Sequence, residues 1–329
     1  MRAVRVHELT GPAGLRVDEV DAPVAGAGEI LIDVKAAGVN FPDVLLTHGK
    51  YQFKPPPPFA PGGEVAGLVA AVGAGVTSFA PGDRVAATMI HGGFAERVAV
   101  PQEAAVRLPG PVSFEVGASS LITYGTTIHA LVDRAALRPG ETLLVLGAAG
   151  GVGVAAIELG KALGARVIAA ASTDEKTAFC KEKGADEVIN YGREDLKERV
   201  KALTGGNGAD VVYDPVGGEL TEAALRATAW EGRLLIVGFA AGPIPKVPMN
   251  LVLLKGCQVV GVFWGVFAAR EPARNRANLE RCLGWIGEGK LKPHLDAVLP
   301  FDRAFEGLER LERRAVLGKV VLVPWGQEA

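Results

Sequence analysis

The chain has 329 residues and a mass of 34.2 kDa, which is long enough for two domains of ordinary size. Apolar residues make up 49% of it and the mean hydropathy is +0.24, so the composition supports buried cores and excludes a disordered chain. Lysine and arginine total 35 against 37 aspartates and glutamates, a formal net charge of -2. Because there is no basic excess, a protein dedicated to nucleic acids or to membrane surfaces is disfavoured.

The three cysteines, Cys180, Cys257 and Cys282, lie far apart and form no C-x-x-C pair. This odd number and wide spacing predict buried thiols in a reducing compartment. The N-terminus carries no apolar signal core, and the longest uncharged run, 65–82, is interrupted by glycine and proline. We therefore expect a cytoplasmic protein without a membrane-spanning segment.

In chain order, the first 120 residues have the pattern of a β-rich domain, in which short apolar segments alternate with turns rich in glycine and proline. The expected strands are 3–7, 15–20, 30–37, 65–72, 84–87 and 94–100. From residue 143 onward, near-continuous apolar runs alternate with amphipathic segments, which predicts an α/β domain with a parallel sheet covered on both faces. These runs are 143–146, 167–171, 188–190, 211–213, 234–237 and 259–263.

The last 60 or so residues are too few to form a domain of their own. They contain two helical patterns, at 272–287 and 304–314, and one strand pattern at 318–323. We expect this tail to fold back onto the N-terminal β-rich domain.

A glycine-rich loop joins the first apolar run of the α/β region to a helix. The strand ends at Leu146 and the helix begins near Val152. Small residues there let the backbone approach a pyrophosphate, whose charge is bound by the free N–H groups of the helix start. The motif is A-x-G-x-x-G, with Ala148 in place of the first glycine, and the alternative is a tight turn of any α/β protein. Its strand–loop–helix context favours dinucleotide binding. The candidate contacts are Gly150, Gly151, Val152 and Gly153.

The end of the second strand distinguishes the two dinucleotides. An NAD enzyme carries Asp or Glu there, on the ribose 2′-hydroxyl. Here the position is Ser172, which leaves space, and Lys176 and Tyr191 are candidates to bind a 2′-phosphate. Asp174 would favour NADH, but we expect it to cap the following helix. The alternative for Lys176 is a solvated position on that helix. The sequence therefore favours NADPH.

Metal chemistry is not expected from this sequence. A zinc site needs clustered Cys, His and carboxylate ligands. No cysteine precedes residue 180, and the five histidines are scattered along the chain. Hydride transfer needs no metal, because the cofactor carries the chemistry.

Seven segments, specific only when taken together, are spread over essentially the whole chain: 37–43 (AGVNFPD), 61–67 (PGGEVAG), 79–85 (FAPGDRV), 122–130 (ITYGTTIHA), 147–153 (GAAGGVG), 184–191 (GADEVINY) and 318–322 (GKVVL). With them, the chain resembles the medium-chain dehydrogenase/reductase superfamily, and within it the zinc-free, zeta-crystallin-like quinone oxidoreductases. Zinc alcohol dehydrogenases of that superfamily carry Cys at the position of Asn40 and His at that of Gly63. Both zinc-ligand positions are therefore lost here.

The resemblance implies a fold and a set of site residues. A Rossmann domain, a doubly wound parallel sheet at 125–265, would be accompanied by a discontinuous β-rich, GroES-like catalytic domain formed by 1–124 and 266–329. Asn40, Asp43 and Tyr51 would lie beside the nicotinamide, and Thr126 would hold its carboxamide or ribose. The cofactor's other side would be lined by Phe239, Phe263 and Gly265.

Plainer roles remain open for several of these residues. Asn40 and Asp43 could simply tie a turn, and Tyr51 could pack against the proline loop that follows it. Phe263 could be an ordinary core residue of an apolar strand.

The expected reaction is hydride transfer from NADPH to a quinone or a related electron-poor enone, without zinc. Tyr51 would donate a proton or orient the substrate. An alternative is a 2-alkenal or enoyl-thioester reductase such as an enoyl-CoA reductase, with Lys50 and Lys54 at the entrance. An alternative outside the enzymes is a crystallin-like structural protein or an RNA-binding protein. The balanced charge of the chain disfavours a nucleic-acid role. We also expect a homodimer formed through an edge strand, Val259–Phe263.

Overall fold

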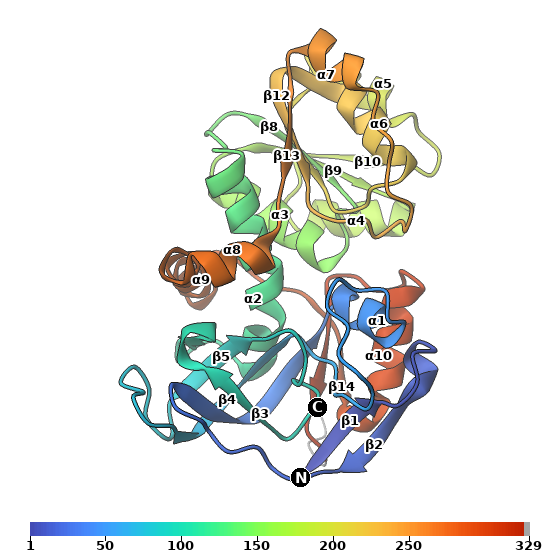
Figure 1. Ribbon diagram of the computed structural model, residues 1–329. Coiled ribbons are helices and arrows are strands. Elements are labelled where there is room, and N and C mark those ends of the chain that lie inside the picture. The colour runs from blue at the N-terminus through green and yellow to red at the C-terminus, as the bar shows by residue number, and fades with distance from the viewer. Residues whose placement is uncertain (326–329) are drawn as a thin grey trace. The chain divides into compact units, whose positions relative to one another are not determined.

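The computed structural model describes residues 1–325, which form two compact units (Figure 1). Unit 1 comprises Met1–Ile122, Pro272–Gly289 and the chain from Pro293 onward. Unit 2 comprises Thr123–Glu271 and Lys290–Lys292. Among the described residues, no helix combines the length and the apolar character needed to cross a membrane.

The strands of unit 1 are β1 (Arg2–Val6), β2 (Leu15–Glu19), β3 (Glu29–Val39), β4 (Glu64–Val72), β5 (Arg84–Thr88), β6 (Arg97–Pro101), β7 (Ala105–Arg107), β14 (Leu295–Pro300) and β15 (Lys319–Val323). Seven of them form a sheet in the order β14-β15-β3-β4-β5-β7, with β6 also paired to β3. β15 runs antiparallel to β3, with Val320 opposite Val39. The tail of the chain therefore completes the sheet of the N-terminal region, while β1 and β2 form a separate antiparallel pair.

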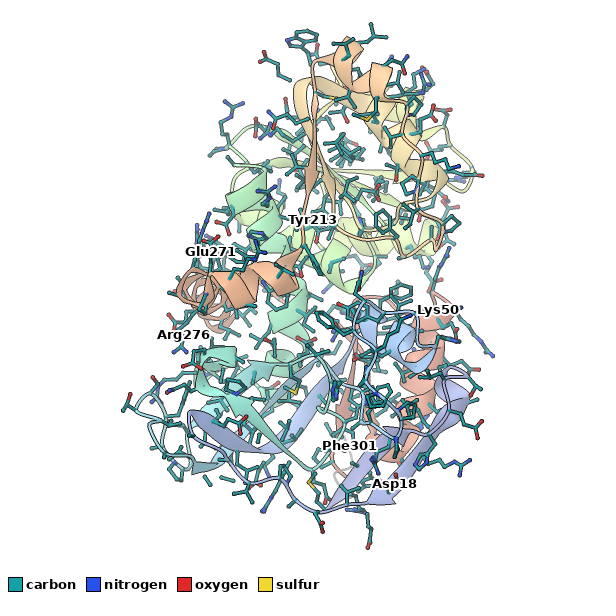
Figure 2. All side chains as sticks on the ribbon, in the orientation of Figure 1. Asp18, Lys50, Tyr213, Glu271, Arg276 and Phe301 are labelled. Atoms are coloured by element: carbon teal, nitrogen blue, oxygen red, sulfur yellow. The ribbon has the colours of Figure 1, made fainter. Side chains whose placement is uncertain are left out.

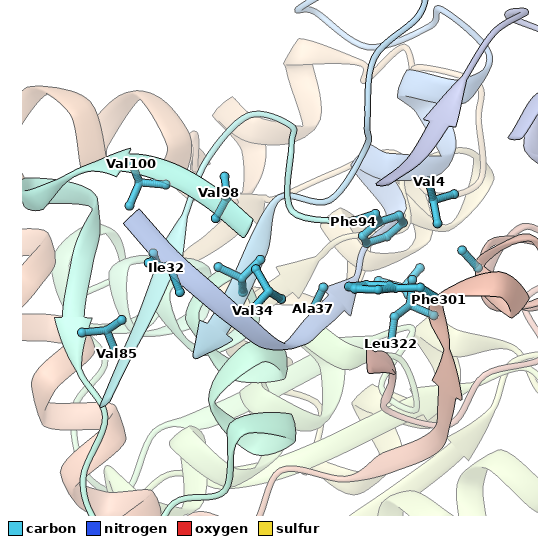
Figure 3. Close-up of a cluster of buried hydrophobic side chains, with 14 of the residues drawn as sticks. Val4, Ile32, Val34, Ala37, Val85, Phe94, Val98, Val100, Phe301 and Leu322 are labelled. Atoms are coloured by element: carbon cyan, nitrogen blue, oxygen red, sulfur yellow. The ribbon is translucent and has the colours of Figure 1, made fainter. Parts of the chain in front are cut away.

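The core of unit 1 joins this tail to the N-terminal strands (Figure 3). Ile32 and Val34 on one face of β3 are 0% and 3% exposed, as the two-residue period of a strand requires. Phe94 and Phe301, from opposite ends of the sequence, pack with their ring centroids 6.5 Å apart. Leu322 of β15 belongs to the same cluster, so unit 1 buries its core only when both ends of the chain are in place.

Among its described residues, unit 1 carries three α-helices of its own: α1 (Phe41–Thr47), α9 (Pro272–Gly287) and α10 (Ala304–Glu312). A fourth helix, α2 (Phe114–Ile128), begins in unit 1 and ends in unit 2. α1 starts directly after β3, with Asn40 as its N-cap and Pro42 in its first turn. Proline is tolerated there because the first N–H groups of a helix have no partner within it.

Unit 2 is built on six parallel strands: β8 (Thr142–Leu146), β9 (Arg166–Ala171), β10 (Glu187–Asn190), β11 (Ala209–Asp214), β12 (Thr228–Ile236) and β13 (Gln258–Gly261). Their order is β10-β9-β8-β11-β12-β13, which is the doubly wound order of dinucleotide-binding folds. The predicted fold class, a Rossmann-type parallel sheet with a β-rich domain, is therefore confirmed. The winding direction changes between β8 and β11, and ligands of such sheets bind at the carboxyl ends of the strands near this point.

The helices of unit 2 are α3 (Gly151–Ala162), α4 (Asp174–Glu182), α5 (Leu196–Leu203), α6 (Glu219–Ala227), α7 (Met249–Lys255) and α8 (Trp264–Arg270), and a π-helical segment, His129–Arg134, continues α2. Leu143 to Leu146 are each 0% exposed because both faces of the sheet are covered. This double cover explains why the strands of this region are nearly continuous apolar runs in the sequence.

Two sequence expectations about elements are corrected. The edge strand expected at 259–263 is Gln258–Gly261, and Phe263 is the N-cap of α8. The strand ends early because its neighbour β12 ends at Ile236, whose carbonyl accepts a hydrogen bond from the Val262 N–H. In addition, α1 and the first part of α2 lie within the first 120 residues, where strands and turns were expected. α2 is rich in serine, threonine and glycine, which are weak helix formers, and it is held by burial instead.

Candidate active site

The end of β3 and the start of α1 place Asn40 and Asp43 in the interior of unit 1, 5% and 1% exposed. The Asn40 backbone N–H donates a 2.8 Å hydrogen bond to Oδ2 of Asp43. The Gly62 N–H donates to the other carboxylate oxygen at 3.0 Å. The structure thus brings these two predicted site residues together and ties them to the loop before β4.

The side-chain amide of Asn40 is fully engaged by polar groups of unit 1. Its Nδ2 donates to Oε1 of Glu64 at 2.9 Å and to the carbonyl of Gly38 at 3.3 Å. Its Oδ1 accepts a hydrogen bond from Nζ of Lys319. The expected position of Asn40 beside a nicotinamide stays a prediction, while its anchoring role is explicit in these contacts.

Burial raises the pKa of Asp43 to about 7, even though the N–H groups of Asn40 and Gly62 and the charge of Lys319 act in the opposite direction. The charge of Glu64 adds to the increase. A carboxyl group with such a pKa exchanges its proton near neutral pH, which suits a group that takes part in acid–base chemistry.

Tyr51 follows α1 and is half-buried against the small cluster formed by Val6, Leu46 and Phe59. Its ring lies 6.2 Å from that of Phe53 in a tilted arrangement. Burial raises the pKa of Tyr51, and the charge of Asp43 raises it further. The phenol therefore stays protonated at neutral pH and is a hydrogen-bond donor.

In unit 2, the predicted glycine loop lies between β8 and α3. Gly150 is the N-cap of α3 and has no side chain to cap the helix. The first three residues of α3 are Gly151, Val152 and Gly153. Their N–H groups lack partners within the helix and point out of its start. This is the arrangement that binds a pyrophosphate in dinucleotide folds.

The third glycine of this motif is required by close packing. A Cβ at Gly153 would lie 2.5 Å from the carbonyl oxygen of Gly147 and 2.6 Å from the Cα of Ala148. Both are backbone atoms, so a side chain at 153 would push the helix start away from the loop. Ala148, in contrast, is 0% exposed and its N–H bonds to Ala170, so the missing first glycine of the motif is accommodated in the core.

The residues expected to bind a 2′-phosphate lie next to one another at the ends of β9 and β10. The register pairs Asn190 with Ala171, so Ser172 and Tyr191 are the next residues of two adjacent strands. The Tyr191 N–H bonds to the carbonyl of Ala171 at 3.0 Å. Lys176 lies in the first turn of α4.

Two details of this corner differ from the sequence expectation. The N-cap of α4 is Thr173, whose side chain accepts from the Lys176 N–H, and not Asp174. The Asp174 carboxylate instead accepts from Asn190 Nδ2 and pairs with the guanidinium of Arg193, both at 2.8 Å. Arg193 is an exposed cation beside the residues predicted to bind a 2′-phosphate. The sequence analysis did not identify it, although its position two residues after Tyr191 was a signal.

Thr126 lies half-buried in the last turn of α2, and its neighbour Thr127 fixes that turn. Thr127 Oγ1 donates to the carbonyl of Thr123 at 2.8 Å, and it shares a hydrogen bond of 2.9 Å with the hydroxyl of Tyr213. Tyr213, labelled in Figure 2, belongs to β11 and is 0% exposed. The turn that carries Thr126 is thus attached to the strand at the switch point of the sheet.

The remaining predicted cofactor residues follow the carboxyl ends of β12 and β13. Phe239 is 37% exposed and packs on the loop after β11, since a Cβ at Gly217 would lie 2.8 Å from its ring. Phe263 is 52% exposed, and a Cβ at Gly265 would meet no atom within 4 Å. Because all six strands are parallel, these residues and the glycine loop are at one edge of the sheet.

Within residues 1–325, no group of three or more His, Cys, Asp or Glu side chains is placed to hold a metal ion. The two positions that carry zinc ligands in the zinc alcohol dehydrogenases are an amide, Asn40, and a glycine, Gly63. The donor set at these positions therefore does not fit zinc.

Comparison with known proteins agrees with this geometry. The family model described as alcohol dehydrogenase GroES-like domain matches residues 26–110, and the one described as zinc-binding dehydrogenase matches residues 151–279. The quinone oxidoreductase-like protein 2 homolog of Nematostella vectensis is 40% identical over 324 residues, covering 98% of this chain and 88% of the relative. The chain belongs to the quinone oxidoreductase-like group of the medium-chain dehydrogenase/reductase superfamily.

Solved structures of this superfamily superimpose on nearly the whole chain. The Escherichia coli quinone oxidoreductase complexed with NADPH is 31% identical with a TM-score of 0.91, and the match covers 98% of this chain and 100% of that one. A structure described as an NAD-dependent alcohol dehydrogenase is 35% identical with a TM-score of 0.90, covering 98% and 99%. This chain is therefore a quinone oxidoreductase-like enzyme with NADPH-binding relatives.

Proposed function

We propose that this quinone oxidoreductase-like enzyme uses NADPH to reduce quinones or related electron-poor enones, without zinc. The observation that carries the proposal is the glycine loop at the start of α3, together with a second strand that is followed by Ser172 instead of an acid. Bound NADPH supplies a hydride from its nicotinamide ring.

The nucleotide would be held at the carboxyl edge of the parallel sheet in unit 2. The N–H groups of Gly151, Val152 and Gly153 would bind its pyrophosphate. Ser172 and Tyr191 would donate hydrogen bonds to the 2′-phosphate. Lys176 and Arg193 would neutralise that phosphate's charge, with Arg193 turning from Asp174 toward a doubly charged group.

Tyr51 would act on the acceptor oxygen. Hydride addition leaves negative charge on that oxygen, which a positioned donor stabilises. Because the pKa of Tyr51 is raised, its hydroxyl stays protonated and can supply this hydrogen bond or the proton itself. Asn40 and Asp43 would fix the segment that carries it.

The test is a kinetic screen of 1,4-benzoquinone, 9,10-phenanthrenequinone and an alkenal with NADPH and NADH. We expect a lower KM for NADPH than for NADH. Replacing Arg193 by Ala should raise the KM for NADPH about tenfold and leave that for NADH within about twofold, since a charged hydrogen bond contributes about 1.5–3 kcal/mol.

Arg199→Ala is the matched control, because Arg199 pairs with Glu194 at 2.7 Å on the neighbouring α5. It should change neither KM. Saturable turnover with NADH but none with NADPH would overturn the nucleotide assignment, and no turnover with any acceptor would overturn the proposed reaction.

A second candidate, an enoyl-thioester reductase, is favoured by one surface feature. Lys50 and Lys54 are exposed on either side of Tyr51 (Lys50 is labelled in Figure 2), where they could attract the phosphates of a CoA ester. Turnover of crotonyl-CoA with a higher kcat/KM than any quinone would select this activity instead.

We further propose a homodimer that pairs along β13. This strand is the last of its sheet, and Val259 on it is 42% exposed. An apolar edge strand is a ready template for pairing with a second copy across a two-fold axis.

A further inference from the structure

Unit 1 contains a buried ion pair to which the proposed reaction gives no role. Lys319 opens β15, whose other residues, Val320–Val323, are apolar and buried. Its Nζ lies 2.8 Å from Oε1 of Glu64, and the two side chains are 7% and 0% exposed. Burying both charges costs free energy, and apolar side chains of similar volume often stabilise a core equally well. Stability alone therefore does not account for the pair.

The hydrogen-bonding groups of this pair are satisfied by protein atoms from distant segments. The three protons of the Lys319 ammonium face Glu64 Oε1, the Asn40 amide oxygen and the carbonyl of Val39, the last at 2.9 Å. Glu64 also accepts from Asn40 Nδ2 and, through Oε2, from the Ile122 N–H, each at 2.9 Å. A fully satisfied polar network of this kind fixes one geometry.

The backbone around the pair is shaped to receive it. A Cβ at Gly38 would lie 2.5 Å from Glu64 Oε1 and 2.0 Å from the carbonyl oxygen of Ala118. Glycine at this position of β3 therefore makes room for the carboxylate beneath Asn40.

The pair acts on the candidate catalytic segment through Asn40. Lys319 holds the amide oxygen and Glu64 the amide nitrogen, so the side chain of Asn40 cannot turn over without losing both contacts. The backbone N–H of Asn40 in turn binds the Asp43 carboxylate. The charges that act on Asp43 are those of Lys319 from β15 and Glu64 from β4, and Asp43 in turn acts on Tyr51 after α1.

We propose that Lys319 and Glu64 are positioning residues of the reaction. The pair locks the side chain of Asn40 and, through Asn40, fixes the position of the Asp43 carboxylate, whose charge acts on Tyr51. The inference rests on the proposed function, because it assigns these residues a part in that reaction. It predicts that the two charges have opposite effects on Asp43, since the charge of Lys319 lowers its pKa and that of Glu64 raises it.

The experiment compares Lys319→Met, Glu64→Gln and the double variant with the wild-type enzyme. Lys319→Met should lower kcat for the best quinone at least tenfold, leave the Kd for NADPH within threefold, and move the limb of the kcat/KM profile near pH 7 to higher pH. Glu64→Gln should move the same limb to lower pH. In the double variant the two shifts should largely cancel, and Lys319→Arg should recover most of the kcat lost in Lys319→Met.

Arg310→Met is the matched control, because Arg310 forms a partly buried ion pair with Asp296 at 2.6 Å in the same unit. It should lower Tm without moving kcat or the pH profile. Folded Lys319→Met and Glu64→Gln variants with wild-type kcat and no shift, or with shifts of the same sign, would overturn the proposal. If Lys319→Met does not fold, Glu64→Gln and the double variant decide by the same criteria.

A second readout separates this inference from the proposed function. The pKa of Asp43 can be followed by the 13C chemical shift of its carboxyl group without any substrate. Opposite shifts of that pKa in Lys319→Met and Glu64→Gln would support the field that the pair imposes even if no quinone were reduced. Turnover by the wild-type enzyme together with an unchanged Asp43 pKa in both variants would reject the inference and leave the proposed function standing.

Discussion

At the scale of single residues, Tyr51 is the group whose chemistry most depends on the acceptor. A quinone oxygen that becomes a phenolate is a weak base that water can protonate, whereas reduction of an enone forms an enolate that needs a stabilising donor. Tyr51 is half-buried, with its pKa raised by burial and by Asp43. A protonated phenol in this setting distinguishes the two classes of acceptor.

Replacing Tyr51 by Phe is therefore expected to lower kcat at least tenfold with an alkenal and less than about threefold with 1,4-benzoquinone, since a positioned proton donor contributes about 10²–10⁴-fold. The measurement is steady-state kinetics at saturating NADPH. Phe53→Leu is the control, because Phe53 contacts the Tyr51 ring but carries no donor. If the wild type and Tyr51→Phe reduced each acceptor at equal rates, Tyr51 would have no part in the chemistry.

Asp43 makes stability depend on pH in a direction opposite to that of most carboxylates. Its pKa is about 7 in the folded protein against 3.8 for a free aspartate. Between these values the folded state binds one more proton than the unfolded state, so this group's contribution to stability falls as pH rises from about 4 to about 7 and is constant above.

In Asp43→Asn this contribution is absent. The free energy of unfolding of the wild type minus that of the variant should decrease between pH 4.5 and pH 7, by on the order of a few kcal/mol in all. Urea unfolding at a series of pH values measures it. Parallel curves for the two proteins over this interval would show that Asp43 is ionised throughout in the folded protein.

The nucleotide corner shows how far single residues could be predicted. That Ser172 and Tyr191 are neighbours could be predicted because each follows an apolar run and consecutive strands of a doubly wound sheet are adjacent; their contact with a nucleotide stays a prediction. Arg193 was not found, because its ion pair with Asp174 depends on the turn after β10. Lys319 was part of a family motif, but the partners of its ammonium come from residues more than 250 positions away, which no local pattern reports.

At the scale of elements, the start of α3 depends on one glycine. The backbone of Gly147 and Ala148 occupies the space that a side chain at 153 would need. Gly153→Ala should therefore displace the helix start, lower the free energy of unfolding by about 1–3 kcal/mol and raise the Kd for NADPH at least tenfold. Calorimetry gives the Kd and urea unfolding gives the stability.

Gly284→Ala provides the matched control within helix α9, since a Cβ there meets no atom within 4 Å. Alanine should leave the Kd unchanged and stabilise the protein by up to about 1 kcal/mol through its higher helix propensity. Unchanged nucleotide binding by Gly153→Ala would show that the loop does not depend on this contact.

The elements themselves differ in how well the sequence specifies them. The strands of unit 2 were predicted because a parallel sheet covered on both faces leaves near-continuous apolar runs. α2 was missed because its Ser, Thr and Gly residues carry no helical signal, and its stability comes from buried residues such as Leu121 and Ile128, 1% and 0% exposed. α8 was missed because the strand before it ends where β12 ends, a limit set by the neighbour and not by Phe263 itself.

At the scale of the whole molecule, the outer edge of the unit 2 sheet carries several exposed apolar side chains. Leu253 and Leu254 on α7 are 79% and 69% exposed, and Val259 on β13 is 42% exposed. Trp230, 69% exposed, extends this surface, since a Cβ at Gly256 after α7 would lie 2.9 Å from its ring. Contiguous apolar residues beside a strand edge are typical of protein–protein interfaces.

A second copy of the chain fits this edge, because a two-fold axis would pair β13 with itself and bury both apolar surfaces. The wild-type protein should sediment at about twice 34.2 kDa at micromolar concentration. Val259→Lys combined with Leu253→Glu should give a folded monomer, because a buried charge opposes edge pairing. Val24→Lys is the control, since Val24 is 85% exposed on unit 1 and should leave the dimer intact. A wild-type protein that sediments at 34.2 kDa at all concentrations would contradict the dimer, and a dimeric double variant would place the interface elsewhere.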